Sequence, residues 1–212
     1  MKVEIWSDVI CPWCYVGKRN FDAALSGFEY RGEVDVVWRA YELDPNAPPE
    51  RSGSYIERIS RKYGISPDDA RQRMSRIVTL GAAAGIEFRF DELRAGNTFD
   101  AHRLLHLARS LGRQQELQER LFAATFSEGH PIGERETLVK LAADVGLAEA
   151  DVQGMLESRD FADDVRADEV EALELGVSGV PFFAFDRRYA VAGAQAPAVL
   201  VEVLERAWAE RG

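Results

Sequence analysis

The order of strand-like and helical patterns along the chain most constrains what it can fold into. Residues 3–7 read as a buried strand, residues 12–28 place apolar side chains at helical spacing, and residues 34–38 are rich in β-branched residues. A strand, a helix and a second strand in this order predict that the two strands pair in parallel.

Strand signals return only near the C-terminal end. From about residue 54 to residue 175 the pattern is almost entirely helical, followed by short strands at 180–185 and 189–192 and a last helix that begins at Pro197. We therefore predict an α/β fold, with one sheet domain interrupted by a large all-helical insertion.

The predicted division of the chain follows from this pattern. Residues 1–45 and 176–212 form the sheet domain, which includes part of the helix at 161–175, and residues 46–175 form the insertion.

Composition narrows the function classes. With 26 Lys and Arg against 36 Asp and Glu, the net charge is −10, which argues against nucleic acid as a partner. The basic residues also show no clustering beyond local pairs such as Arg187 and Arg188. Because no apolar run approaches the roughly 20 residues of a membrane span, we expect no membrane partner, and without a secretory signal we expect a cytoplasmic protein.

Both cysteines lie in the motif Cys11-Pro12-Trp13-Cys14, between the first strand and the first helix. A helix N-terminus stabilises a thiolate through its unpaired N–H groups and its dipole. The thiolate is the nucleophile of thiol–disulfide exchange, so this placement favours redox chemistry.

The two cysteines are expected to have different roles. Cys11 lies at the helix tip, so we predict that it is exposed and attacks, whereas Cys14 lies one turn inside, on the apolar stripe, and is the buried resolving thiol. Pro12 and Trp13 are candidate substrate contacts at the same tip. Asp8 is interpreted as a cap of the first turn. The alternative is that it tunes a cysteine pKa by accepting the proton of Cys14.

Two other readings of the cysteine pair stay open. A closed zinc site needs four ligands, and His102 and His106 would share one helix face and could join the cysteines. We nevertheless predict no metal, because two histidines on one helix are more often part of a surface or an interface. A structural disulfide is less consistent still with a cytoplasmic protein.

A second candidate element is Gly179-Val180-Pro181, which enters the late strand. We predict a cis peptide bond at Pro181, beside Cys11, which leaves the backbone of Val180 free to pair with an extended substrate. The alternative is an ordinary trans proline at a strand entrance.

Four segments together resemble a known family. They are residues 7–17 around the cysteines, 97–103 in the insertion, 179–183 around the proline and 193–195 near the end. On these segments the chain resembles the thioredoxin superfamily, in particular the DsbA-like thiol oxidoreductases and their FrnE-like branch.

The resemblance implies a thioredoxin fold, a cis-proline that faces the cysteine pair, and oxidoreductase or isomerase activity on thiols. Related proteins include 2-hydroxychromene-2-carboxylate isomerase and kappa-class glutathione transferase, which usually carry Ser where Cys11 stands. They hold glutathione with backbone groups before the cis-proline and with a loop that matches Gly193-Ala194-Gln195. The resemblance also makes Asn97 and His102 candidates for the cleft between insertion and sheet.

Three functions follow as hypotheses. The first is a thiol–disulfide oxidoreductase or isomerase that uses Cys11 and Cys14 on a protein or small-molecule thiol or disulfide. The second is a glutathione-dependent isomerase or transferase, which would tolerate loss of Cys14, and the third is a non-enzymatic binding or chaperone module. We expect no tightly bound cofactor. Glutathione is a candidate co-substrate, and a homodimer is a candidate assembly.

Overall fold

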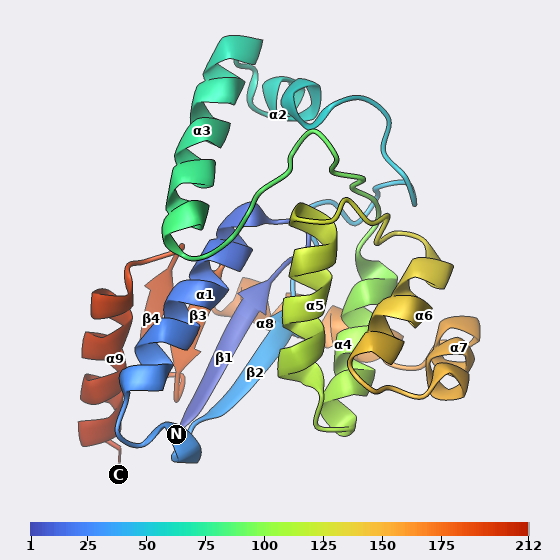
Figure 1. The fold of residues 1–212 in the computed structure, drawn as a ribbon. Coiled ribbons are helices and arrows are strands. Elements are labelled where there is room, and N and C mark those ends of the chain that lie inside the picture. Colours follow the sequence, from blue (N-terminus) through green and yellow to red (C-terminus); the bar gives the residue numbers. More distant parts are fainter. Residues whose placement is uncertain (212) are drawn as a thin grey trace.

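Strands from the two ends of the chain lie side by side in one sheet (Figure 1). The computed structural model describes residues 1–211 and orders the strands β2–β1–β3–β4. The strands are β1 (Lys2–Ser7), β2 (Asp35–Ala40), β3 (Phe182–Phe185) and β4 (Tyr189–Ala192). Strands β1 and β2 pair in parallel, which confirms the prediction, and the other two pairings are antiparallel.

The helices confirm a helical insertion between the strands of a thioredoxin-like sheet. They are α1 (Pro12–Gly27), α2 (Tyr55–Tyr63), α3 (Pro67–Ala83), α4 (Phe99–Ser110), α5 (Gln114–Phe126), α6 (Arg135–Asp144), α7 (Glu149–Glu157), α8 (Ala162–Glu174) and α9 (Pro197–Ala209), with a short 3-10 turn at Arg31–Glu33. None of the helices in residues 1–211 is long and apolar enough to cross a membrane.

A long connection interrupts the helical block, because residues 86–97 form neither helix nor strand. In this segment Phe88 and Phe90 stack on each other, with ring centroids 5.0 Å apart. The backbone N–H of Arg89 donates to the carbonyl of Phe126 at 2.7 Å. Long-range packing and this hydrogen bond therefore hold the segment in place.

Alternation along β1 divides the sheet domain into layers. Val3 and Ile5 belong to the apolar cluster that α1 and α9 cover, whereas Trp6 packs with Ala172 of α8 on the opposite face. Figure 1 shows α1 in front of the sheet and α8 behind it. Because α8 covers the sheet, it is a layer of the sheet domain as well as the end of the insertion, and the division at residues 46 and 175 stays a prediction.

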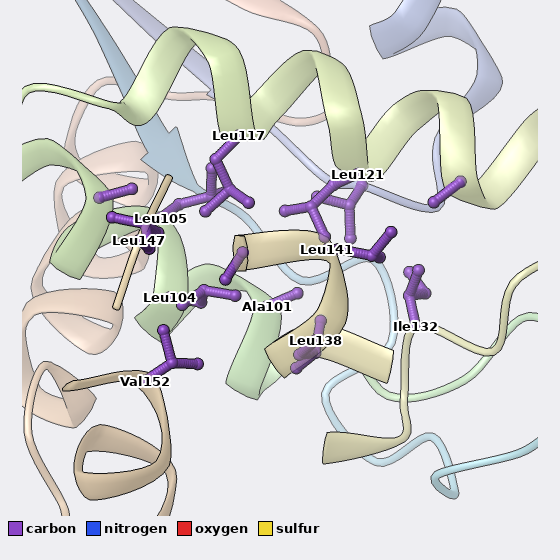
Figure 2. Packing of buried hydrophobic residues seen from close by; sticks show 14 of the residues in the cluster. Ala101, Leu104, Leu105, Leu117, Leu121, Ile132, Leu138, Leu141, Leu147 and Val152 are labelled. Atoms are coloured by element: carbon purple, nitrogen blue, oxygen red, sulfur yellow. The ribbon is translucent and has the colours of Figure 1, made fainter. Parts of the chain in front are cut away.

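The rest of the insertion has its own core, between α4, α5, α6 and α7 (Figure 2). Leu104, Leu117, Leu121 and Leu138 are fully buried there. Side chains at the start of α5 also cover the outer edge of β2, since the Gln114 amide donates to the carbonyl of Trp38 at 3.0 Å and accepts from its N–H at 3.1 Å. These contacts fix the insertion against the sheet.

Helices α2 and α3 form a hairpin at one end of the molecule. Ser54 and Glu57 form a capping box at the start of α2, and Gly64 ends that helix in the left-handed region. The side chain of Ser66 accepts from the N–H of Asp69 and begins α3, as its sequence predicts. Figure 1 shows this hairpin above the end of the sheet where α1 begins.

Candidate active site

The turn between β1 and α1 positions the cysteine pair. Cys11 is the N-cap of α1 and Pro12 is its first residue, so the missing N–H of proline falls where a helix needs none. The N–H of Cys11 donates to the carbonyl of Asp8 at 3.0 Å, and the N–H of Cys14 donates to the carbonyl of Cys11 at 3.0 Å. Both thiols are free.

The two thiols differ less in exposure than their positions in the motif predict. Cys14 is 0% exposed, as predicted, but Cys11 is only 5% exposed, so its prediction as an exposed tip residue is wrong. The reason is tertiary: Tyr55 of α2 and Met74 of α3 pack in the same apolar cluster as Cys11 and cover it. Cys11 still borders a cavity, whereas Cys14 does not.

The environment of Cys14 favours its protonated form. Burial raises the pKa of the Cys14 thiol well above its ordinary value, and the neighbouring Cys11 raises it further. A hydrogen bond from Ser7 and one from the backbone of Asp8 oppose this effect without cancelling it. The protonated form of the Cys14 thiol is therefore favoured over the thiolate.

The late proline lies next to the cysteines. The Val180–Pro181 peptide bond is cis, which confirms the prediction, and the Cys11 thiol donates to the carbonyl of Val180 at 3.6 Å. The N–H of Gly193 donates to the carbonyl of Pro181 at 2.8 Å, and Ala194 packs against the cluster that holds both cysteines.

Gln195 belongs to the same loop but lies further out. Its side-chain amide donates to the carbonyl of Ala192 at 2.9 Å, and its own carbonyl accepts from the side chain of Asn20 at 2.8 Å. The structure thus brings the loop 193–195 to the proline, and it uses Gln195 to hold the loop.

Asp8 has a different local role from the predicted one. No side chain caps α1, so the interpretation of Asp8 as a helix cap is wrong. Its fully buried carboxylate accepts from the N–H of Leu43 at 2.7 Å and from the N–H of Ile10 at 3.4 Å. Because Leu43 follows β2, Asp8 ties the end of the neighbouring strand to the cysteine turn.

The candidate residues of the insertion do not reach the cavity beside Cys11. The Asn97 amide donates to the carbonyls of Pro45 and Ala47, both at 3.2 Å, and its oxygen accepts from the N–H of Phe99. His102 is 2% exposed, so it is not a surface residue, and its Nε2 lies 3.4 Å from the Asp8 carboxylate. Among residues 1–211, no group of three or more His, Cys, Asp or Glu side chains is placed to hold a metal ion.

A cavity of about 740 Å³ opens beside Cys11. Its floor comes from the cysteine turn and its walls from the connector after β2 and from α2 and α3. The lining residues are Ile10, Cys11, Pro12, Trp13, Leu43, Asp44, Pro48, Arg51, Ser52, Tyr55, Arg58, Ile59, Arg61, Lys62, Tyr63, Arg73, Met74, Arg76, Ile77 and Ala95. The predicted substrate contacts Pro12 and Trp13 are among them.

Most of this lining was missed by reasoning from the sequence, including its basic residues. The statement that basic residues show no clustering is wrong in three dimensions. Arg58, Arg61 and Lys62 lie three and four residues apart on α2, and Arg73 and Arg76 lie three apart on α3, so each group shares a helix face. That spacing was the available signal.

The fold and the cysteine pair define a class of protein. A four-stranded sheet flanked by α1, α9 and α8, with two cysteines at the start of α1 and a cis-proline beside them, is a thioredoxin fold that carries a helical insertion. The model of the DSBA-like thioredoxin domain matches residues 2–205. The chain therefore belongs to the DSBA-like thioredoxin family.

Similar proteins agree with this assignment. The chain is 30% identical over 185 residues to the uncharacterized protein YwbO of Bacillus subtilis, covering 85% of this chain and 84% of that protein. The crystal structure of a probable DsbA oxidoreductase from Streptomyces coelicolor is 42% identical and superposes with a TM-score of 0.94, covering 100% of this chain and 92% of the other. The cytosolic disulfide reductase DsbM from Pseudomonas aeruginosa, solved with GSH, has the same fold at 18% identity, with a TM-score of 0.69 and coverage of 99% and 100%.

Proposed function

We propose that this protein is a thiol–disulfide oxidoreductase in which Cys11 attacks the substrate and Cys14 resolves the mixed disulfide. The observation that carries the proposal is the asymmetry of the two thiols. Cys11 borders the cavity and contacts the carbonyl of Val180, whereas Cys14 is fully buried behind it with a raised pKa.

Reduction of a substrate disulfide takes place in two successive thiol–disulfide exchanges. The Cys11 thiolate attacks one sulfur of a substrate disulfide, and the S–S bond breaks so that the first substrate thiolate leaves with the electron pair. Cys14 then loses its proton to that thiolate and attacks Cys11, which releases the second substrate thiolate. The protein ends as the Cys11–Cys14 disulfide, and the substrate has gained two electrons; the reverse sequence oxidises a dithiol.

The cis-proline segment supports the geometry of the first exchange. The backbone carbonyl of Val180 accepts from the Cys11 thiol, at the place where an extended substrate would pair with it. The apolar cluster that holds both cysteines keeps the Cys14 thiol behind Cys11, which favours its attack on the mixed disulfide over exchange with thiols from solution.

Single cysteine variants test the proposal. With a reducible disulfide substrate, Cys14→Ser should accumulate a mixed disulfide on Cys11 that intact-mass spectrometry detects, and Cys11→Ser should form none. Turnover of insulin disulfides should fall to background in both variants. Full turnover by Cys14→Ser would contradict the dithiol route and favour a glutathione-dependent isomerase or transferase.

Further parts of the proposal concern the co-substrate, the compartment, the direction of electron flow and the assembly. We propose glutathione as a co-substrate and the cytoplasm as the compartment, supported by the likeness to a cytosolic disulfide reductase solved with GSH. Equilibration of the Cys11–Cys14 pair with glutathione buffers gives the reduction potential and hence the direction of electron flow. Light scattering of the purified protein tests the proposed homodimer.

A further inference from the structure

The cavity beside Cys11 is strongly basic although the chain as a whole is acidic. Five cationic side chains line its walls from the α2–α3 hairpin: Arg58, Arg61, Lys62, Arg73 and Arg76. The net charge of the chain is −10, so these residues form a local positive patch within a negative molecule. We call them the cationic wall.

The charges of the cationic wall lack acidic partners. Arginines elsewhere in the chain commonly pair with carboxylates, as Arg39 pairs with Asp168 and Arg120 with Asp144. Within residues 1–211, no carboxylate lies within 4.0 Å of the cationic groups of the wall.

The contacts that the cationic groups of the wall do make are with aromatic rings and backbone carbonyls, which do not neutralise their charge. Arg73 and Lys62 stack over the ring of Tyr63, at 5.5 and 5.9 Å. Arg58 donates to the carbonyl of Gly53 at 2.6 Å, and one of its terminal nitrogens is buried without a hydrogen bond to residues 1–211. Burial lowers the pKa of Arg58, and like charge from Arg51 lowers it further, against smaller opposing contributions from Tyr55 and Glu57; an anion bound there would relieve this unfavourable arrangement.

Asp44 is the one acidic side chain that residues 1–211 contribute to the cavity lining, and it does not pair with the wall. Its carboxylate lies 2.9 Å from Arg51, a cavity residue of the connector after β2 that is not part of the cationic wall. The acid therefore pairs with Arg51 and forms no ion pair with the five cations of the wall.

The size and floor of the cavity indicate a small ligand. Its volume of about 740 Å³ lies within the roughly 300–1,000 Å³ of typical small-molecule sites. Trp13 on the floor and Met74 and Ile77 on the wall from α3 supply an apolar surface in the same cluster as Cys11. A ligand that fits has an apolar or sulfur-bearing part at the floor and acidic groups at the wall.

We propose that the cationic wall selects small disulfides or thiols that carry two or more acidic groups, carboxylate or phosphate, and presents their sulfur to Cys11. This inference rests on the proposed function, because it uses the same nucleophile and the same two-electron exchange. It assigns substrate specificity to the α2–α3 hairpin of the insertion rather than to the backbone at Val180.

Three disulfides of matched length and different charge test the inference. They are 3,3′-dithiodipropionate with two carboxylates, bis(2-hydroxyethyl) disulfide with none, and cystamine with two ammonium groups. The second-order rate of thiol loss from the reduced protein should decrease in that order at low salt. We expect about a tenfold or larger ratio between the dianion and the dication, and a smaller ratio at 0.5 M salt.

Variants assign the selectivity to residues. The triple variant Arg58→Gln, Arg73→Gln and Arg76→Gln should lower the dianion-to-neutral rate ratio by about tenfold. A control variant removes two exposed charges outside the cavity, Lys140→Gln and Arg159→Gln, and should leave the ratio unchanged. The disulfides of glutathione and coenzyme A, used in the same assay, distinguish carboxylate from phosphate as the preferred acid.

The outcomes separate the two proposals. Equal rates for the three disulfides, or a ratio that the triple variant does not change, would overturn the specificity inference while Cys11-dependent exchange still supports the proposed function. Absence of any Cys11-dependent exchange would overturn both.

Discussion

Gly17 sits where helix α1 meets the cis-proline, and replacing it with alanine should disturb both stability and reactivity. An added Cβ would lie 2.8 Å from Cγ of Pro181 and 3.5 Å from the ring of Phe183. Carbon atoms pack best at about 3.5–4.0 Å, so the proline ring or the helix must move by roughly 0.7 Å or more. The proline ring has little freedom to move away.

The size of the effect follows from two opposing contributions. Alanine stabilises a helix interior by about 1 kcal/mol relative to glycine. Overpacking of a tight contact costs about 1–3 kcal/mol. Gly17→Ala should therefore change the free energy of unfolding by between about zero and 2 kcal/mol in the destabilising direction.

A second glycine provides the matched control. Gly154 lies inside α7, where an added Cβ has no atom within 4 Å. Gly154→Ala should stabilise the protein by up to about 1 kcal/mol, because only the helix propensity changes. The two variants should thus differ by about 1–3 kcal/mol in urea unfolding, with a slower rate of alkylation or disulfide exchange at Cys11 only in Gly17→Ala, since Val180 and Pro181 must shift.

Either of two results would refute this reasoning. If Gly17→Ala is as stable as Gly154→Ala, the contact between α1 and Pro181 is looser than 2.8 Å implies. If the variant is destabilised but its Cys11 reacts at the wild-type rate, the proline contact supports the fold without positioning the Val180 carbonyl.

Three further substitutions test other contacts. Burial by itself raises the pKa of Glu4, but hydrogen bonds from Arg187 and Arg39 outweigh it and lower the pKa from 4.5 to about 2. Glu4→Gln should therefore lower the free energy of unfolding by about 2 kcal/mol near neutral pH. The difference between the variant and the wild type should shrink as the pH falls from 4.5 towards 2. A difference that is constant with pH would argue against the ion pairs. Asp8→Ala leaves the buried N–H of Leu43 unpaired and should cost about 1–3 kcal/mol in urea unfolding, more than Asp8→Asn, and equal losses would show that the hydrogen bond is not what Asp8 supplies. Leu121→Ala opens the insertion core (Figure 2) and should lower the free energy of unfolding by about 2–5 kcal/mol, so a loss below 1 kcal/mol would indicate that this core is not packed as described.

Patterns of nearby residues predict much of the fold. The apolar stripe and the Pro12 start predict α1, and the Ser66 cap and Pro67 predict the start of α3. These features depend on hydrogen bonds and spacing within a few residues, which is why they are readable before any tertiary contact is known. The course of the connection 86–97 is not readable in this way, because partners such as the carbonyl of Phe126 lie in other parts of the chain.

The candidate site likewise has features that follow from local sequence and features that depend on tertiary contacts. Placement of Cys11 and Cys14 at a helix start follows from local sequence alone, and that placement already indicates thiol chemistry. The contact of Cys11 with Val180 spans 169 residues, and it exists only because β3 pairs with β1.

The same limit applies to the exposure of Cys11 and to the cationic wall. A helix tip is exposed in isolation, but the α2–α3 hairpin folds over this one and buries Cys11. Helical spacing puts Arg58 with Arg61 and Arg73 with Arg76, yet only the packing of the hairpin turns both faces towards one cavity. Local sequence is sufficient to place the cysteine pair, because a helix start is built from neighbouring residues, whereas the surroundings of the pair depend on contacts between segments that are distant along the chain.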